Sequence, residues 1–301
     1  MVKKQNKRRF SVGDSKPKDI VVPVMGPTGA GKSTFINYLL GENQMRVGHQ
    51  LTSCTSDLQV GYVKLSGEFQ GSRLVIVDTP GFDDTYEGDT VILRRIAEWL
   101  EKSYRNNMVL GGVLYLHDIS NDRFSGTARR NLEMFQHLCG NDALSKVVLG
   151  TTKWGRIPQE IGISHEKELK EVHWKTLLKK GSTVCRFTDS RESALSFVGV
   201  IQRNVKRRDL LDTFLQIQEE LAIDKKIIPE TKAGKELRYT LQEVLEMQKQ
   251  MVNLETSMAE GGDDDAQQKL EETQKKMEKL LTQIKELKIP FGRRLRSMFG
   301  F

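Results

Sequence analysis

The sequence has few of the features of a secreted or membrane-spanning protein. Its 301 residues include three cysteines, Cys54, Cys139 and Cys185. Because they are odd in number and far apart, they predict neither a disulfide framework nor a metal-binding cysteine motif. No apolar run is long enough to span a bilayer, and the basic N-terminus lacks the apolar segment of a signal peptide. We therefore expect a cytoplasmic protein, with peripheral attachment to a membrane left open by its basic ends.

Positive charge is concentrated at the two ends of the chain. The net charge is +7; residues 1–18 carry seven basic side chains against Asp14 alone, and residues 288–301 add four more. The residues between them are therefore slightly acidic. A nucleic-acid-binding domain concentrates basic groups on a folded face, so we expect no nucleic-acid partner. The ends are expected to meet an anionic membrane surface. For the C-terminal tail, a solubilising segment whose phenylalanines fold back on the protein is the favoured alternative.

One glycine-rich turn carries the clearest chemistry in the chain. An apolar, strand-like run at 20–25 leads into the turn, and a helix-like run at 33–40 follows it and ends at Gly41. The turn matches the pattern G-x-x-x-x-G-K-[ST] in the strand, turn and helix context that the pattern requires. Backbone N–H groups of such a turn, together with the positive end of the helix, bind phosphate. The predicted nucleotide-binding residues here are Gly26, Pro27, Thr28, Gly29, Ala30, Gly31, Lys32, Ser33 and Thr34.

Residues inside and beyond this turn predict a triphosphate and magnesium site. We expect Lys32 to reach the β- and γ-phosphates and the Ser33 hydroxyl to coordinate Mg²⁺. Asp78 directly follows the strand-like run 73–77, which places it at the carboxyl edge of the sheet beside the turn. There it can hold a Mg²⁺-bound water, and the Gly81 N–H can bond the γ-phosphate.

A threonine in the polar loop 42–57 is expected to complete the site. Such a residue binds Mg²⁺ when a γ-phosphate is present and is released after hydrolysis. Thr55 is the preferred candidate and Thr52 the alternative. The predicted catalytic residues are then Lys32, Thr55 and Gly81, and the predicted metal ligands are Ser33, Thr55 and Asp78.

The chain divides into four predicted segments. Residues 1–18 form a basic tail that we expect to be disordered. Residues 19–208 alternate strand-like and helix-like runs, as in a three-layer α/β sandwich with a mostly parallel sheet. Residues 209–288 form a helical extension, and residues 289–301 form a basic-aromatic tail. Within the sandwich we predict strands at 20–25, 56–65, 73–77, 109–116, 147–150 and 183–187, and helices at 33–40, 91–104, 127–138, 165–180 and from 192.

Apolar residues at heptad spacing run through the helical extension, in two sets on either side of a Gly-Asp turn at 261–265. This spacing is typical of coiled coils. It predicts an antiparallel helical hairpin, and packing of each segment on the α/β domain is an equal alternative. The first set is Leu237, Thr240, Val244, Met247, Met251, Leu254 and Met258; the second is Leu270, Thr273, Met277, Leu280, Ile284 and Leu287.

The motifs resemble those of a known family. Residues 26–34 and Asp78-Thr79-Pro80-Gly81-Phe82 resemble the septin and paraseptin GTPases, which include the immunity-associated GTPases and the chloroplast import receptors. The segments Ser125-Gly126-Thr127, Asn131-Leu132-Glu133-Met134-Phe135 and Thr151-Thr152-Lys153-Trp154 resemble a group of fungal G-domain proteins. The resemblance covers about residues 19–205. It implies a P-loop NTPase (G-domain) fold, binding of GTP and GDP with Mg²⁺, slow hydrolysis, and a homodimer formed through the G domain.

The base-reading motif departs from the family pattern. Such GTPases carry [NT]-K-x-D, whereas this chain has Thr152-Lys153-Trp154-Gly155. The stem of Lys153 can stack along the base with Thr152 beside it, but Gly155 replaces the carboxylate that accepts hydrogen bonds from guanine. A site without that partner loses discrimination, so ATP stays open as a substrate beside GTP. We interpret Trp154 as a core or interface aromatic rather than a base-stacking residue.

Hydrolysis is expected to be slow because Phe82 stands where small signalling GTPases carry a water-orienting glutamine. A second copy could supply the missing group, and Arg123 and Arg129 are the candidates, with surface salt bridges favoured for both. The sequence thus predicts a GTP-controlled switch. A non-hydrolysing nucleotide-binding scaffold that oligomerises through the heptad segments, and an ATPase, are the alternatives.

Overall fold

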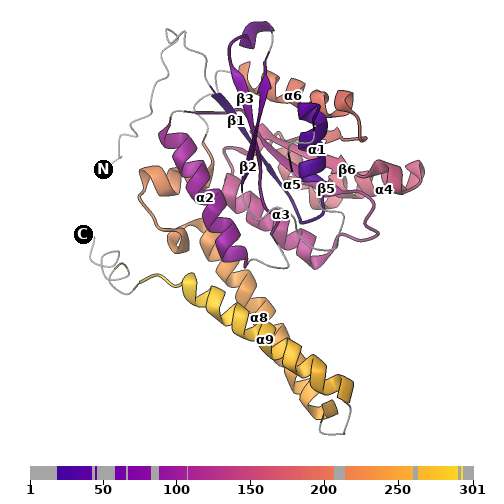
Figure 1. The fold of residues 1–301 in the computed structure, drawn as a ribbon, viewed down its shortest axis with the longest axis vertical. Helices are drawn as coiled ribbons and strands as arrows, with labels where there is room; N and C mark the ends of the chain where they lie inside the picture. Colours follow the sequence, from indigo (N-terminus) through magenta and orange to yellow (C-terminus); the bar gives the residue numbers. More distant parts are fainter. Residues whose placement is uncertain are drawn as a thin grey trace.

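A seven-stranded, mostly parallel sheet forms the centre of this computed structural model (Figure 1). The structure describes residues 19–42, 45, 58–65, 67–82, 88–106, 108–206, 214–259, 264–290 and 293, with the backbone alone at 254, 257–259 and 264–266. The strand order is β2-β3-β1-β5-β6-β7, with β4 paired to β1, and β2 runs antiparallel to β3 at the edge. The strands are β1 (Asp19–Met25), β2 (Gln59–Lys64), β3 (Arg73–Asp78), β4 (Val109–Leu110), β5 (Val113–Asp118), β6 (Val147–Thr152) and β7 (Thr183–Arg186).

Helices cover both faces of the sheet and extend beyond it (Figure 1). The α-helices are α1 (Lys32–Leu40), α2 (Asp89–Arg105), α3 (Gly126–Cys139), α4 (Gln159–Glu168), α5 (Lys175–Lys179), α6 (Arg191–Lys206), α7 (Gln216–Gln218), α8 (Lys232–Ala259) and α9 (Asp264–Glu286). The π-helical turns are η4 (Leu169–His173) and η6 (Glu219–Ile223), and the 3₁₀ turns are η1 (Gly67–Phe69), η2 (Leu144–Lys146), η3 (Trp154–Arg156) and η7 (Ile228–Glu230).

The two larger apolar cores lie on the two faces of the sheet, and a small third cluster contains Val21, Val75 and Val77. Successive side chains of a strand point to opposite faces, so Val113 and Tyr115 of β5 join one core while Leu114 and Leu116 join the other. The first core packs α2 and α3 on the sheet, and the second packs α1 and α6. The predicted three-layer α/β sandwich with a mostly parallel sheet is confirmed.

Two predicted elements are wrong in detail. The strand expected at 109–116 is divided into β4 and β5 because Gly111 leaves the strand path; its N–H donates to the Val21 carbonyl at 3.0 Å. A Cβ atom at Gly111 would lie 2.4 Å from Ile20, so the close approach requires glycine. The single helix expected at 165–180 is instead three consecutive segments: α4, the π turn η4 and α5. The first segment begins at Gln159, earlier than predicted, and the helix is interrupted at the fully buried Trp174. The Trp174 N–H bonds the Leu169 carbonyl at 2.6 Å, the i to i+5 step of a π turn.

The helices α8 and α9 run alongside each other in opposite directions (Figure 1). They also pack on the α/β domain, α8 against α3 and α9 against α2, where the Thr90 hydroxyl donates to Glu286 Oε2 at 2.9 Å. Pairing of the helices and packing on the domain, posed as alternatives, therefore occur together. No helix in the described part of the chain is both long and apolar enough to cross a membrane.

The heptad prediction fits α9 better than α8. In α9, Leu270, Thr273 and Ile284 are buried, as is Leu287 just beyond its end. In α8 the predicted Met247 and Met251 are 48% and 46% exposed. The buried apolar side chains there are Ala233, Leu237, Leu241 and Leu245, at a spacing of four. This part of α8 packs against α2 and α3 as well as α9, so its buried face does not follow the seam of a two-helix coiled coil.

Candidate nucleotide-binding site

The predicted phosphate-binding turn joins the carboxyl end of β1 to the first turn of α1. Its first glycine is required by packing: Gly26 has φ 137°, and a Cβ atom there would lie 2.2 Å from the Leu116 carbonyl oxygen of β5. Gly31 precedes α1 with φ 84°, in the left-handed region. The turn is therefore shaped by contact with the neighbouring strand and by glycine conformations that other residues rarely adopt.

The Lys32 ammonium group lies inside this turn. It donates to the carbonyl oxygens of Gly26 at 3.0 Å and Pro27 at 2.9 Å, and the residue is 7% exposed. The positive charge is thus concentrated among backbone groups at a helix N-terminus, where an anionic phosphate is stabilised.

Ser33 and Asp78 lie together beside the turn, as predicted for metal ligands. The Ser33 hydroxyl donates to Asp78 Oδ2 at 2.5 Å. Asp78 is fully buried, and its Oδ1 has no hydrogen-bond partner among the described residues. Burial raises the pKa of Asp78, with Lys32 and Ser33 acting in the opposite direction. A buried carboxylate oxygen without a partner, next to a hydroxyl, is the donor set that a hard cation such as Mg²⁺ takes.

Gly81 is in direct contact with the phosphate-binding turn. A Cβ atom at Gly81 would lie 2.4 Å from the Thr28 backbone nitrogen, and the Thr28 hydroxyl donates to the Gly81 carbonyl at 3.4 Å. The structure thus brings together Lys32, Ser33, Asp78 and Gly81. Thr55 and Thr52 lie outside the described residues, so their predicted roles stay predictions.

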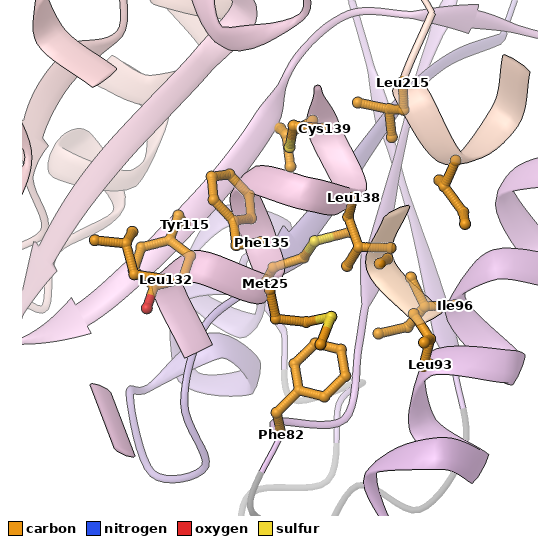
Figure 2. Close-up of a cluster of buried hydrophobic side chains, with 14 of the residues drawn as sticks. Met25, Phe82, Leu93, Ile96, Tyr115, Leu132, Phe135, Leu138, Cys139 and Leu215 are labelled. Carbon is orange, nitrogen blue, oxygen red and sulfur yellow. The ribbon is translucent and has the colours of Figure 1, made fainter. Parts of the chain in front are cut away.

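Phe82, the next residue, is a core side chain. It is 7% exposed and belongs to the first core, near Met25, Leu93 and Ile96 (Figure 2). Its ring carries no hydrogen-bonding group and is held among apolar side chains of β1 and α2. It therefore cannot orient a water molecule for attack on a phosphate.

The predicted base-reading loop, residues 152–155, is hydrogen-bonded to the predicted phosphate-binding turn. The Thr152 hydroxyl lies 2.9 Å from the Ala30 carbonyl oxygen and 3.2 Å from that of His117. The Trp154 indole donates to the Thr151 hydroxyl at 3.0 Å, and the Arg186 guanidinium lies 4.4 Å from the ring centroid. Trp154 is thus a packing residue, as interpreted from the sequence. A Cβ atom at Gly155 would have no neighbour within 4 Å among the described atoms.

Asp118, the last residue of β5, lies outside the sequence motifs that predicted the site. Its Oδ2 accepts a hydrogen bond from the Lys153 ammonium at 2.6 Å. The available signal was its position: β5 and β6 are adjacent parallel strands, and Asp118 pairs in register with Thr152. Residues that end neighbouring parallel strands meet at one edge of the sheet.

A cavity of about 280 Å³ opens between the loop after β5 and α4. Arg123 lines it, together with His117, His165 and His173. Arg123 and Arg129 are both exposed. His165 Nδ1 lies 3.0 Å from the Ile119 carbonyl oxygen, and His173 stacks on Phe124 with ring centroids 3.9 Å apart.

Comparison with known proteins places this geometry in context. Residues 21–153 match a protein-family model described as "50S ribosome-binding GTPase". A stretch of 88 residues is 34% identical to the translocase of chloroplast 34 homolog of Chlamydomonas reinhardtii. That match covers 28% of this chain and 22% of the relative, so the chain matches about a fifth of the relative's length.

Solved structures of chloroplast translocon components have the same fold. One, described as showing that dimerisation is important for the GTPase activity of atToc33 and psToc159, has a TM-score of 0.51 at 15% identity and covers 64% of this chain and 85% of its own. Another is a dimerisation-deficient R130A mutant of Toc33 from Arabidopsis thaliana, with a TM-score of 0.50 at 16% identity over 63% of this chain and 86% of its own. The fold of residues 19–206 is therefore that of P-loop GTPases.

Proposed function

We propose that this protein binds GTP and GDP with Mg²⁺ and acts as a switch that hydrolyses GTP slowly. The observation that carries the proposal is the Ser33–Asp78 pair at 2.5 Å, beside a turn that encloses the Lys32 ammonium. Within the part of the chain that the structure describes, Asp78 Oδ1 has no hydrogen-bond partner. The residues present thus fit a triphosphate with its metal. The family match over residues 21–153 supports guanine nucleotide as the ligand.

Each residue of the site has a distinct role in this proposal. Backbone N–H groups of residues 28–33 hold the phosphates, and Lys32 neutralises the β- and γ-oxygens. Ser33 and Asp78 provide oxygen ligands for Mg²⁺, which when bound would neutralise charge between those phosphates, and Thr55 is proposed to join them. The Gly81 N–H, which lies next to Thr28, is proposed to sense the γ-phosphate. Thr152 and Lys153 flank the base.

The expected result of a single-turnover experiment is slow hydrolysis by the isolated protein. Phe82 is packed in the core, so no side chain at that position activates water. We expect a rate constant below about 10⁻³ s⁻¹, the order of intrinsic hydrolysis by a small GTPase that lacks its partner's arginine. Quenched-flow assay of [γ-³²P]GTP with Mg²⁺ measures it. Turnover at about 10 s⁻¹ without a partner would contradict the switch.

Two alternatives are separated by simple measurements. Competition between GTP and ATP for the wild-type site, in the presence of Mg²⁺, tests the ATPase that Gly155 leaves open. The nucleotide that co-purifies with the protein tests the scaffold: GDP indicates hydrolysis, and intact GTP indicates a scaffold that does not hydrolyse.

We further propose pairing of two copies through the G domain, at a face that includes the exposed Arg123. One similar structure is described in terms of dimerisation and GTPase activity, which supports this proposal. Assignment to the septin and paraseptin group, and the likeness to fungal G-domain proteins, rest on the sequence motifs and are likewise proposals. So are the division at residues 18, 208 and 288 and the coiled-coil character of the extension.

We also propose a cytoplasmic protein whose basic ends attach it to anionic membranes. Residues 289–301 combine arginines with aromatic side chains, and each basic residue near an anionic surface contributes about 1 kcal/mol. We expect sedimentation with phosphatidylserine vesicles to fall at least about fivefold when these residues are deleted. Equal sedimentation of the deletion variant would favour the folded-back tail instead.

A further inference from the structure

We propose that Asp118 is a positioning residue of the nucleotide site, which holds the Lys153 ammonium so that the lysine stem lies across the place of the purine ring. The inference rests on the proposed function, because it concerns how that same site binds the base of the nucleotide. It assigns a role to a carboxylate outside every sequence motif of the site.

The contact between the two residues is short and fixed from both sides. Lys153 Nζ lies 2.6 Å from Asp118 Oδ2, with the side chains 20% and 13% exposed. The other carboxylate oxygen accepts hydrogen bonds from the Ser120 N–H at 2.9 Å and the Ser120 hydroxyl at 2.6 Å. Burial alone would raise the pKa of Asp118, but the hydrogen bonds from Lys153 and Ser120 hold it below its usual range. The carboxylate is therefore charged and its orientation is restricted at neutral pH.

The backbone of Lys153 is also held in an unusual state. Its φ is 61°, a left-handed conformation that is uncommon for a residue with a side chain. The preceding Thr152 is pinned to Ala30 in the phosphate-binding turn, and the β5–β6 register places Asp118 opposite Thr152. Strain of this kind persists where the surroundings over-determine it, and it clusters at ligand sites. The Lys153 side chain is thus fixed at both ends: Asp118 holds its ammonium group, and the contacts of Thr152 hold the backbone at its base.

Neither Trp154 nor Gly155, the next two residues of the loop, provides a side chain for contact with the base. Gly155 offers no carboxylate for the base edge, and Trp154 is engaged by Thr151 and Arg186. What remains is the aliphatic stem of Lys153, which gives the ring a flat apolar surface only if the side chain stays extended. Release of its ammonium would let the stem rotate away from the base.

The first test compares two ligands that share the phosphates and differ in the base. We expect Asp118→Asn to weaken binding of Mg²⁺-GTP about tenfold and to leave binding of Mg²⁺-tripolyphosphate unchanged. The latter needs only the phosphate-binding turn. Asp122→Asn, an exposed carboxylate of the same loop, is the matched control and should bind both ligands as the wild type does. Asp118→Glu, which keeps the charge, should recover most of the GTP affinity.

A double-mutant cycle tests whether Asp118 acts through Lys153. If it does, Asp118→Asn combined with Lys153→Met binds GTP no more weakly than Lys153→Met alone. Additive losses, equal losses for GTP and tripolyphosphate, or wild-type affinity in Asp118→Asn would each overturn the inference. Absence of GTP binding by the wild type itself would instead refute the proposed function, and with it this role. A far-ultraviolet circular dichroism spectrum equal to that of the wild type shows that each variant is folded.

Discussion

Replacing Lys32 by alanine is expected to weaken Mg²⁺-GTP binding by about 100-fold or more, close to 3 kcal/mol. The ammonium lies within 3.0 Å of the Gly26 carbonyl and 2.9 Å of the Pro27 carbonyl, at the centre of the turn. It is the cationic side chain that the turn itself supplies to the phosphates, and charge-assisted hydrogen bonds to phosphate are among the strongest that proteins make. Fluorescence titration with a labelled GTP analogue measures the loss.

A second variant controls for loss of the turn's structure in the alanine variant. Lys32→Met keeps the length of the side chain without its charge, and it should lose as much affinity as the alanine variant. Lys64→Ala, at an exposed position of β2, should bind as the wild type does. If Lys32→Ala retains wild-type affinity, phosphate capture by this turn is refuted, whatever the rest of the molecule does.

Acidification from pH 7 to pH 5 is expected to cost about 2 kcal/mol of unfolding free energy through His117 alone. His117 is 5% exposed, and its Nδ1 has no hydrogen-bond partner among the described residues. Burial lowers its pKa from 6.5 to about 4; the nearby His173 adds to this effect and Asp118 opposes it. Because the folded pKa lies below the unfolded one, the neutral ring favours the folded state. That stability is complete above pH 6.5 and is lost as pH falls towards 4.

Urea unfolding at several pH values measures this loss, and His117→Phe isolates it. The aromatic ring should keep the packing against Phe124 and Trp174, whose centroids lie 5.4 and 6.1 Å away, without a titrating group. Because the pKa of Asp78 is raised, its contribution to the free energy of unfolding increases on acidification. This contribution is the same in both proteins and cancels in the comparison. Asp118 and Glu166, each in its own salt bridge, have lowered pKa values. Their contributions to the free energy of unfolding are therefore lost only below pH 4 to 4.5. Equal pH dependence in wild type and variant would show that His117 is not buried in neutral form.

Local pattern was sufficient to predict most of the sandwich. The runs that became β1, β3 and β6 are almost wholly apolar, as strands covered on both faces must be, and Gly41 ends α1 in the left-handed conformation expected of a C-terminal cap. The failures came from tertiary contacts. Gly111 divides β4 from β5 because Ile20 of a neighbouring strand lies too close for any side chain.

The helical extension shows the same limit. Heptad spacing identified the buried face of α9, where α8 is the main neighbour. It failed for Met247 and Met251 because part of α8 also packs on α2 and α3. Sequence spacing carries no information on how many neighbours a helix has, so the buried face of a helix with several neighbours cannot be read from one repeat.

In the candidate site, too, some residues could be predicted from local sequence and others could not. Lys32, Ser33, Asp78 and Gly81 were predictable because each motif fixes backbone geometry within a few residues, and strand order then joins the motifs. Asp118 was not, because its partner Lys153 is 35 residues away and only the register of two strands brings them together. Phe82 was recognised as unsuited to catalysis, but its burial beside Leu93 and Ile96 depends on the position of α2.

The central claim is that the glycine turn, Lys32 and the Ser33–Asp78 pair together bind a nucleoside triphosphate with its metal. Calorimetric titration of nucleotide-free protein with GMPPNP, with Mg²⁺ and again with EDTA, tests it most directly. We expect one site per chain with micromolar affinity, weakened at least about tenfold without the metal. No binding at millimolar GMPPNP with Mg²⁺ present, or the same affinity with EDTA, would contradict it.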